Sequence, residues 1–252
     1  MIIHKEKKIG LFFNPKVASV TTMRIFTEVA MTKTLPITLY RNNFKPTDPS
    51  TWVPDHVTYD TFYQTHGQYI EDIQDYKFYC FFRNPIQRLI SAYRYYKRHY
   101  YFSFLGFFYG YNNADTYEAY DYNEVQRVGY DKLPQRLKDK IETITLDDFI
   151  KSNYFTIDIH NVIGPVVIFR PQTDWLDHPQ VELLDYRWYE NELRRFIVML
   201  GSRYDGRVWV MNDSVKLQND SKDEILTKES ENIIRKYYEK DFTFFENKGI
   251  IF

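Results

Sequence analysis

The sequence predicts an α/β fold class, with a central and mainly parallel sheet flanked by helices. Residues 9–13 (Ile-Gly-Leu-Phe-Phe) and 77–82 (Lys-Phe-Tyr-Cys-Phe-Phe) are short and largely apolar, as strands buried on both faces are. After each of them a proline interrupts the strand, and apolar residues then recur at helical spacing. A strand followed by a helix, repeated along the chain, is typical of a parallel sheet.

The two helices that follow these strands have recognisable starts. Ser19 is the expected N-cap of the first helix, which we predict to continue to about residue 32. Pro85 is expected at the first position of the second helix, which we predict to end near residue 100. Further along the chain, periodicity and turn signals predict strands at 37–40, 56–59 and 181–185 and helices at 146–152, 190–200 and 222–245.

Composition indicates a soluble globular protein. Of the 252 residues, 44% are hydrophobic and 27% are charged, and the net charge of −1 argues against a nucleic-acid-binding protein. Cys80 is the only cysteine, which excludes a disulfide framework or a multi-cysteine metal site, and we expect it in the core. No apolar stretch approaches the roughly 20 residues of a membrane span, and the N-terminus lacks the apolar region of a signal peptide. We therefore expect a cytoplasmic protein without an integral membrane segment.

We expect a single domain over residues 1–252, because neither an internal repeat nor a linker-like change of composition interrupts the chain. Aromatic residues make up 19% of the sequence and are dense between residues 101 and 130. That segment has no clear period, and long irregular segments in compact domains are usually functional. We predict that 101–130 is a binding loop or a lid. Rings that fill a core under a lid explain the same composition equally well.

The first strand-to-helix loop, residues 15–22 (Pro-Lys-Val-Ala-Ser-Val-Thr-Thr), has the features of an anion site. Its backbone N–H groups precede a helix and lie at the positive end of the helix dipole. Lys16 adds a positive charge, and hydroxyl donors come from Ser19, Thr21 and Thr22. The Walker A pattern fails, because Val17 stands where that pattern has the Ser or Thr that binds Mg²⁺. Taken alone, the loop is better explained as an ordinary helix start with a solvated lysine.

The second loop, Arg83-Asn84-Pro85, follows the other buried strand. An arginine at the carboxyl end of a strand and ahead of a helix suits bidentate contact with a phosphate. Ser91 lies about two turns along the predicted helix and can add a hydroxyl to the same anion. Alone, this loop too is more simply explained by a surface arginine and an exposed serine.

Together the two loops resemble those of the sulfotransferases that use 3′-phosphoadenosine 5′-phosphosulfate (PAPS). The likeness is closest to the carbohydrate sulfotransferases of the heparan 2-O, chondroitin and dermatan type and their bacterial relatives. Their first loop, P-K-x-[AG]-[SC]-[ST]-[ST], is matched by residues 15–21 except at Val20. Their second, R-[DN]-P-x-x-R-x-x-S-x-[YF], is matched in full by residues 83–93.

The resemblance implies a P-loop-NTPase-like, three-layer fold and PAPS as the cofactor, with no metal. It assigns the 5′-phosphosulfate to a loop made of Lys16, Val17, Ala18, Ser19, Val20, Thr21 and Thr22, and the 3′-phosphate to Arg83 and Ser91. At Val20, which lacks the family's hydroxyl, the backbone N–H is the contact that remains. The implied acceptor is a carbohydrate or another hydroxyl-bearing molecule, and the family places acceptor-binding loops where this chain has residues 101–130.

Later segments resemble the family in the same order. They are P-Q-T at Pro171-Gln172-Thr173, a strand and an acidic helix over 184–193, N-x-S at Asn212-Asp213-Ser214, and a terminal Y-x-x-D-x-x-x-F helix over 237–245. Ile168 stands where the family usually has a histidine. Each of these motifs is unspecific alone, and it is their order after two cofactor loops that supports the resemblance.

Sulfuryl transfer needs a base for the acceptor hydroxyl and donors that stabilise charge on the leaving phosphate. We expect Lys16 to serve the leaving phosphate. We predict His66 as the base, because Thr65-His66-Gly67 resembles the segment that holds the histidine base of the heparan 2-O members. A loop histidine bonded to the backbone explains His66 equally well. The alternatives are His99, His160, Asp60 and Glu71.

Two further interpretations stay open on the sequence. A nucleotide-dependent kinase has the same fold, but the missing Mg²⁺-binding hydroxyl after Lys16 argues against it. A non-catalytic glycan- or partner-binding protein is the other, and the departures at Val20 and Ile168 are compatible with it. Such a protein would bind PAPS weakly or not at all.

Overall fold

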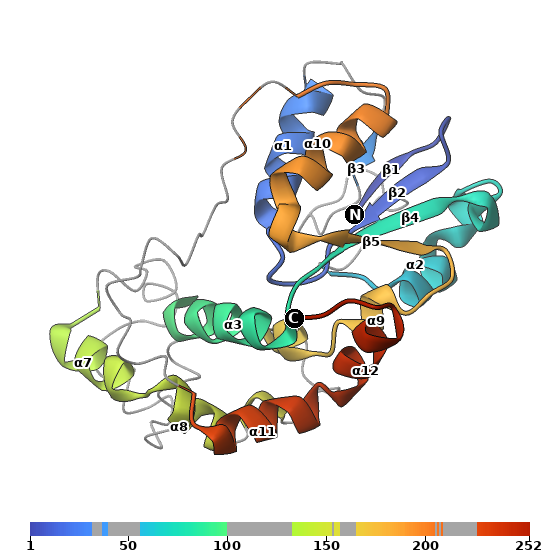
Figure 1. Cartoon of the computed structure of the whole chain (residues 1–252). Coiled ribbons are helices and arrows are strands. Elements are labelled where there is room, and N and C mark those ends of the chain that lie inside the picture. Colours follow the sequence, from blue (N-terminus) through green and yellow to red (C-terminus); the bar gives the residue numbers. More distant parts are fainter. Residues whose placement is uncertain are drawn as a thin grey trace. The chain divides into compact units, whose positions relative to one another are not determined.

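The computed structural model describes residues 1–31, 37–39, 56–99, 133–152, 154–156, 165–204, 206, 208 and 226–252 of the chain (Figure 1). The chain forms two compact units: the first comprises Met1–Pro85, Arg170–Asp213 and Lys240–Phe252, and the second comprises Ile86–Phe169 and Ser214–Glu239. The single domain over 1–252 stays a prediction. The segment 101–130, predicted as a binding loop or lid, lies outside the described residues.

The first unit holds a five-stranded sheet in the order β3-β1-β2-β4-β5. Its strands are β1 (Ile2–His4), β2 (Ile9–Phe12), β3 (Thr38–Leu39), β4 (Lys77–Phe82) and β5 (Val181–Asp185). β2, β4 and β5 are parallel neighbours, whereas β1 runs antiparallel to both β2 and β3. The predicted α/β fold with a mainly parallel sheet is therefore confirmed.

The helices of this unit are α1 (Ser19–Met31), α2 (Tyr59–His66), α9 (Thr173–Leu176), α10 (Tyr189–Met199) and α12 (Glu239–Asn247). Single 3₁₀ turns occupy Gly67–Tyr69, Ile73–Asp75 and Tyr186–Trp188.

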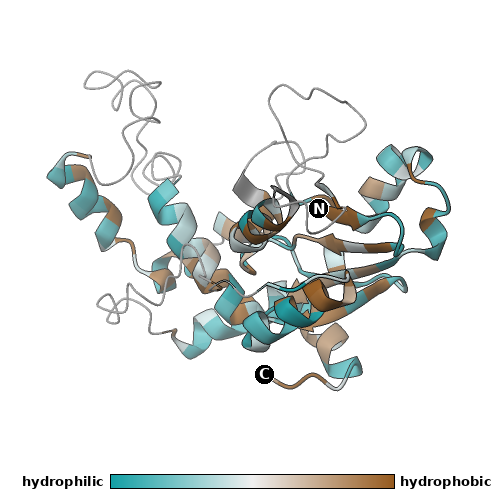
Figure 2. Cartoon of the chain, turned by 90° about the horizontal axis from the view of Figure 1, so that it is seen from above, coloured by the Kyte–Doolittle hydropathy of each residue, from teal (hydrophilic) through white to brown (hydrophobic). Residues whose placement is uncertain are grey.

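Helices cover both faces of the sheet, which confirms the three predicted layers (Figure 1). α1 and α10 pack together on one face, where the rings of Phe26 and Phe196 meet edge to face with centroids 5.9 Å apart. α2 lies on the other face, and its Phe62 ring meets that of Phe12 at 6.0 Å. Side chains alternate between the two faces along a strand, so Leu11 packs on the face covered by α1 and α10, whereas Phe12 packs on the face covered by α2. Hydrophobic residues gather on the strands between the helices (Figure 2).

The centre of the sheet is tightly packed. Cys80 in β4 is fully buried, as expected for a core residue. Gly10 in β2 lies against the ring of Phe78 in the neighbouring strand, and a Cβ atom at position 10 would come within 2.4 Å of that ring. The two strands can therefore approach here because residue 10 has no side chain.

Two predicted elements are wrong. The strand predicted at 56–59 is instead the approach to α2, since the Thr58 side chain accepts a hydrogen bond from the Thr61 backbone N–H and caps the helix. The long helix predicted at 222–245 is two helices, α11 (Lys228–Tyr237) and α12. Tyr238 separates them, because its backbone leaves helical geometry (φ −98°, ψ 24°) and its buried hydroxyl donates to the Phe169 carbonyl.

The second unit is helical where the structure describes it. Its helices are α3 (Pro85–His99), α7 (Gln135–Thr143), α8 (Leu146–Lys151) and α11, with 3₁₀ turns at Tyr154–Thr156 and Pro165–Phe169. Thr145 opens α8 with a capping box. The Asp147 carboxylate in α8 accepts hydrogen bonds from the hydroxyls of Thr227 and Ser230 at the start of α11. No helix among the described residues is long and apolar enough to cross a membrane.

Candidate active site

The carboxyl ends of the three parallel strands lie together and form one edge of the sheet, the carboxyl edge; the amino ends of the same strands form the opposite edge. β2 and β4 are in register at Phe12 and Cys80, and β4 and β5 are in register at Phe82 and Asp185. In open α/β sheets, ligands bind beyond the carboxyl ends of the strands. The loop that carries Lys16 and the loop that begins at Arg83 both leave the sheet at this edge, next to the turn that follows β5.

The first loop has an unusual backbone conformation. Lys16 and Ala18 both have positive φ, at 66° and 59°, although neither is glycine. Such conformations cost about 1–3 kcal/mol each and persist where the surroundings enforce them, often at functional sites. Alternation of left-handed and right-handed residues turns successive backbone N–H groups inward and makes a concavity that binds anions. α1 begins at Ser19, so the positive end of its dipole adds to the same place.

Some side chains of this loop are buried in the core, and others are exposed or half-buried. The Val17 side chain is buried in the core against α1 and α10, so only its backbone can face a ligand. Val20 is 53% exposed, and Ser19 and Lys16 are half-buried. Thr21 is buried. The loop can therefore offer a ligand the ammonium group of Lys16, the hydroxyl of Ser19 and several backbone N–H groups.

Thr22 holds the start of α1 in place. Its side chain is buried, and its hydroxyl donates to the Ala18 carbonyl at 3.0 Å and lies 2.8 Å from the Tyr189 hydroxyl. Burial raises the pKa of the Tyr189 phenol, so that group stays protonated and serves as a donor. Since the Thr22 hydroxyl gives its proton to Ala18, it accepts the proton of Tyr189. These contacts join the first loop to α10.

The second loop places a cation beside the turn that follows β5. Arg83 is half-buried, and its guanidinium carbon lies 4.8 Å from the centre of the Tyr186 ring. A cation over an aromatic face is stabilised without losing its charge. Ser91, the other residue predicted to contact the 3′-phosphate, lies half-buried in α3 and belongs to the second unit.

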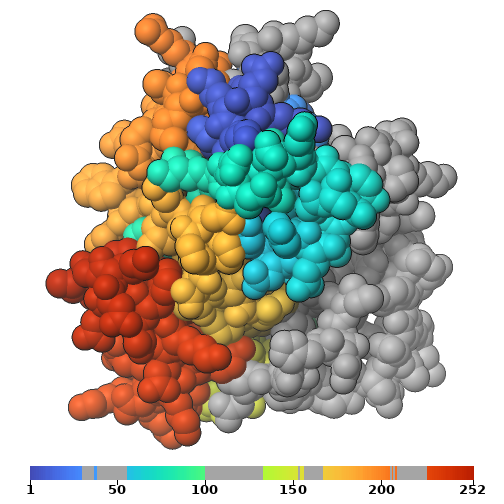
Figure 3. Space-filling view, turned by 90° about the vertical axis from the view of Figure 1, so that its right-hand side faces the viewer, coloured from blue at the N-terminus to red at the C-terminus, as the bar shows by residue number. Residues whose placement is uncertain are grey.

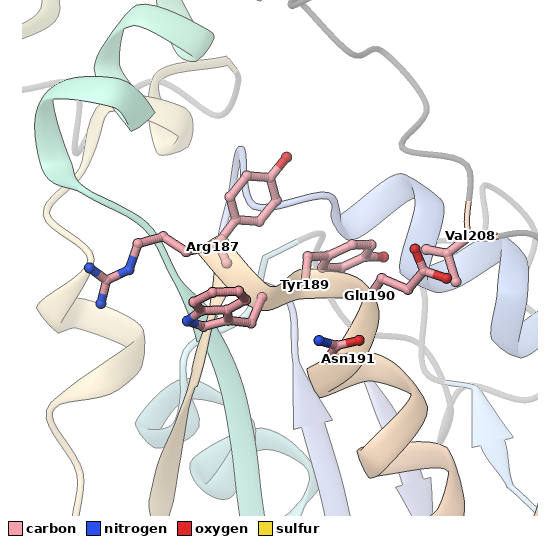
Figure 4. A pocket seen from close by; sticks show the side chains of 7 residues that line it. Arg187, Tyr189, Glu190, Asn191 and Val208 are labelled. Atoms are coloured by element: carbon pink, nitrogen blue, oxygen red, sulfur yellow. The ribbon is translucent and has the colours of Figure 1, made fainter.

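A pocket with a volume of about 340 Å³ opens beside this turn (Figure 4). It is lined by Tyr186, Arg187, Trp188, Tyr189, Glu190, Asn191 and Val208. The Tyr189 and Glu190 side chains extend toward Val208, whereas Arg187 extends the other way (Figure 4). Trp188 is 62% exposed. On the sequence, residues 184–193 resemble the strand and acidic helix of the family, but no pattern there gives any of these side chains a role in a pocket.

His56 lies at the carboxyl edge of β2. Its Nδ1 is 2.8 Å from the carbonyl oxygen of Phe13, the residue that follows β2, and its own carbonyl accepts from Nε1 of Trp175 at 2.8 Å. A carbonyl oxygen can only accept, so Nδ1 carries the proton, and in the neutral ring Nε2 carries the lone pair. His56 has positive φ, at 60°. The sequence predicts a strand at 56–59 and gives no role to His56, so its position at the end of β2 is evident only in the structure.

His66, the predicted base, is the last residue of α2. Its ring is buried and stacks on Phe62 with centroids 5.4 Å apart. Nδ1 lies 2.7 Å from the hydroxyl of Thr65, which itself donates to the Thr61 carbonyl. The segment that follows leads to the opposite edge of the sheet, where Asp72 pairs with Lys8 just ahead of β2. These contacts join His66 to its own helix.

The structure describes three of the four remaining candidates for the base. Asp60, Glu71 and His99 are exposed, and His160 lies outside the described residues. Ile168, at the position of the family's usual histidine, is buried. In the described part of the chain, no three His, Cys, Asp or Glu side chains are grouped so that they could hold a metal ion.

Comparison with protein families gives one match. The model described as Sulfotransferase family matches residues 1–161, which is well over half of the chain and includes both strand-to-helix loops. Comparisons with curated proteins and with solved structures gave no match. The matched residues contain the Lys16 loop, His56 and the Arg83 loop, which the structure places at one edge of the sheet. The chain therefore belongs to the sulfotransferase family.

Proposed function

We propose that the protein transfers the sulfuryl group of PAPS to a hydroxyl group of an acceptor, and that the acceptor is a carbohydrate. Membership of the sulfotransferase family supports the reaction class. One observation carries the choice of donor: two cationic loops, at Lys16 and Arg83, leave neighbouring parallel strands at the same edge. PAPS has phosphate groups at two positions, and a ligand of that kind matches two separate anion sites.

The two loops differ in what they can recognise. The Lys16 loop combines a lysine, two left-handed residues and a helix N-terminus, which suits the bridging and terminal oxygens of a phosphosulfate. The guanidinium of Arg83 suits bidentate contact with a phosphate that is not transferred. We therefore assign the 5′-phosphosulfate to the Lys16 loop and the 3′-phosphate to Arg83, with Ser91 as a further predicted contact.

In the proposed reaction the acceptor oxygen bonds to sulfur as the bond from sulfur to the phosphate oxygen breaks. Lys16 stabilises the charge that develops on the leaving phosphate. The acceptor hydroxyl loses its proton to a base, and the observations favour His56 over His66 for this role. His56 is fixed at the carboxyl edge of β2 with its proton on Nδ1, so the lone pair of Nε2 can take the proton. His66 stays a predicted alternative.

The exposed ring of Trp188 supports a carbohydrate acceptor. Its indole lines the pocket beside the Arg83 loop, and a flat aromatic surface suits the apolar face of a sugar ring. Asn191 and Glu190, at the same pocket, offer hydrogen-bonding groups of the kind that sugar hydroxyls need. The aromatic segment 101–130 stays a predicted second part of the acceptor site.

Transfer from labelled PAPS to a panel of polysaccharides and oligosaccharides tests the proposal. We expect label in at least one glycan, together with the release of adenosine 3′,5′-bisphosphate. The Lys16→Ala variant serves as the control, because it lacks the cation that we assign to the leaving phosphate. Label that appears equally with both proteins, or no release of the bisphosphate with any acceptor, would show that the proposal is wrong.

A further inference from the structure

Gln172 joins the two phosphate loops through one buried side chain. Its Oε1 accepts from the backbone N–H of Arg83 and from Nδ2 of Asn14, each at 3.0 Å. Its Nε2 donates to the carbonyl oxygen of Arg83 at 2.7 Å. The side chain is fully buried. A single amide thus satisfies both backbone polar groups of Arg83, as a neighbouring strand would, and holds Asn14 as well.

Asn14 extends this link to the Lys16 loop. β2 ends at Phe12, and two residues later the buried Asn14 uses Nδ2 to donate to the carbonyl of Phe81 in β4 at 3.2 Å as well as to Gln172. The side chain of Asn14 therefore continues the contact between β2 and β4 after the backbone pairing has ended. Lys16 follows two residues further on, so its starting position is set by the same bonds.

Gln172 is itself anchored by a buried carboxylate. The backbone N–H groups of Gln172 and Thr173 donate to the two oxygens of Asp241 in α12 at 2.8 and 2.9 Å. Asp241 is fully buried, and hydrogen bonds from N–H groups to a buried carboxylate are among the stronger ones in proteins. α12 lies next to the residues around α9 at the surface of this unit (Figure 3).

We propose that Gln172 is a positioning residue that fixes the spacing between the Lys16 loop and the Arg83 loop. The proposal rests on the proposed function, in which one ligand has to reach both loops. A second phosphate adds affinity only if its site stands at the right distance when the first is bound. Holding both loops rigid before the ligand arrives removes the cost of ordering them. Loss of the amide should therefore reduce the gain in affinity that a second phosphate brings. The affinity of each loop for a single phosphate should change less.

Three ligands separate these effects: adenosine 3′,5′-bisphosphate, adenosine 5′-monophosphate and adenosine 3′-monophosphate. In the wild-type protein we expect the bisphosphate to bind about 100-fold more tightly than either monophosphate. In Gln172→Met, which has similar volume and lacks the amide, we expect that advantage to fall about tenfold or more. The dissociation constants of the monophosphates should change less than about threefold, because each loop keeps its own residues.

Gln180 provides a matched control. Its side-chain amide also bridges backbone groups, with Nε2 donating to the carbonyls of Gln74 at 2.6 Å and Tyr76 at 3.0 Å, but it lies ahead of β5 at the opposite edge of the sheet. Gln180→Met should lower the melting temperature and leave the advantage of the bisphosphate unchanged. Gln172→Glu is the second variant, because it keeps both acceptor bonds and lacks the proton that Nε2 donates to Arg83.

The outcomes distinguish the two proposals. An undiminished advantage of the bisphosphate in Gln172→Met and Gln172→Glu, or an equal weakening of all three ligands, would overturn the role of Gln172 while leaving the PAPS site in place. A wild-type protein that does not prefer the bisphosphate would overturn the PAPS site, and the role of Gln172 with it. If Gln172→Met does not fold, the ratio measured with Gln172→Glu decides.

Discussion

Nδ1 of His56 lies 2.8 Å from the carbonyl oxygen of Phe13, one residue after the end of β2 and three residues before Lys16. This contact fixes a histidine beside the loop that we assign to the phosphosulfate. It also determines which nitrogen of the neutral ring carries the proton. The position of His56, the base that we propose, therefore follows from how the residues before α2 meet the carboxyl end of β2.

Replacement of His56 tests its role as the base. In His56→Ala we expect kcat to fall by about 10²–10⁴, the usual contribution of a positioned base, with the binding of adenosine 3′,5′-bisphosphate close to that of the wild type. In the wild type the rate should fall as the solution is acidified, because a protonated imidazole accepts no proton. His66→Ala is the matched control. Near-normal kcat in His56→Ala and a large loss in His66→Ala would reverse the assignment.

The two phosphate anchors should respond differently to substitution. Arg83→Ala should weaken binding of adenosine 3′,5′-bisphosphate by about 2–5 kcal/mol, because one partner of a phosphate charge pair is removed. Lys16→Ala should lower both affinity and kcat, since Lys16 meets the phosphate in the ground state and the developing charge in the transition state. Calorimetric titration together with steady-state kinetics measures both quantities. A Lys16→Ala variant with unchanged kcat would contradict its role at the leaving phosphate.

Thr22 provides a test of the difference between a structural and a ligand-binding hydroxyl. Thr22→Val leaves the buried hydroxyl of Tyr189 without its acceptor, so the free energy of unfolding should fall by about 1–3 kcal/mol. Addition of Tyr189→Phe should recover part of that loss, as a double-mutant cycle in urea would show. Binding of adenosine 3′,5′-bisphosphate should stay close to that of the wild type. A large loss of binding with unchanged stability would assign the hydroxyl to the ligand.

Asp147 should make the second unit sensitive to acid. Hydrogen bonds from Lys151, Ser230 and Thr227 hold the pKa of the Asp147 carboxyl well below its usual value. Because the folded pKa lies below the unfolded one, this carboxylate contributes stability above an unfolded pKa of about 3.9, and the contribution is lost as pH falls below that value. Asp147→Asn should lower the free energy of unfolding by about 1 kcal/mol at neutral pH and reduce its decline between about pH 5 and 2. Chemical denaturation across this range measures both. If the free energy of unfolding of the variant declined with acid as steeply as that of the wild type, Asp147 would not have this role.

The elements that follow local rules could be predicted from the sequence. β4 has the predicted bounds, because its apolar run ends at Phe82 and Pro85 begins α3 only three residues later. The strand predicted at 181–185 and the helix predicted at 146–152 are likewise found, and Thr145 caps that helix. β1 was not predicted, since it has three residues and owes its place to antiparallel pairing with β2. Residues 2–4 alone therefore do not indicate a strand; the pairing with β2 determines it.

The site could be predicted only in part, because some of its contacts join distant residues. Lys16 and Arg83 follow recognisable strands, which brings their loops to one edge by topology alone. His56 depends on a left-handed backbone and on Trp175, which lies 119 residues away in the sequence. A local signal did exist, since Thr58 is an N-cap that places His56 just ahead of a helix. Gln172 acts through Arg83, 89 residues away, which no local pattern reveals.

Calorimetric titration of the wild-type protein with adenosine 3′,5′-bisphosphate and, separately, with ATP shows whether the chain has a nucleotide site that requires a 3′-phosphate. We expect one binding site per chain for the bisphosphate and an affinity for ATP that is lower by about tenfold or more, because ATP has no phosphate at the 3′ position to contact Arg83. Equal affinities for the two nucleotides, or no binding of the bisphosphate, would contradict this expectation.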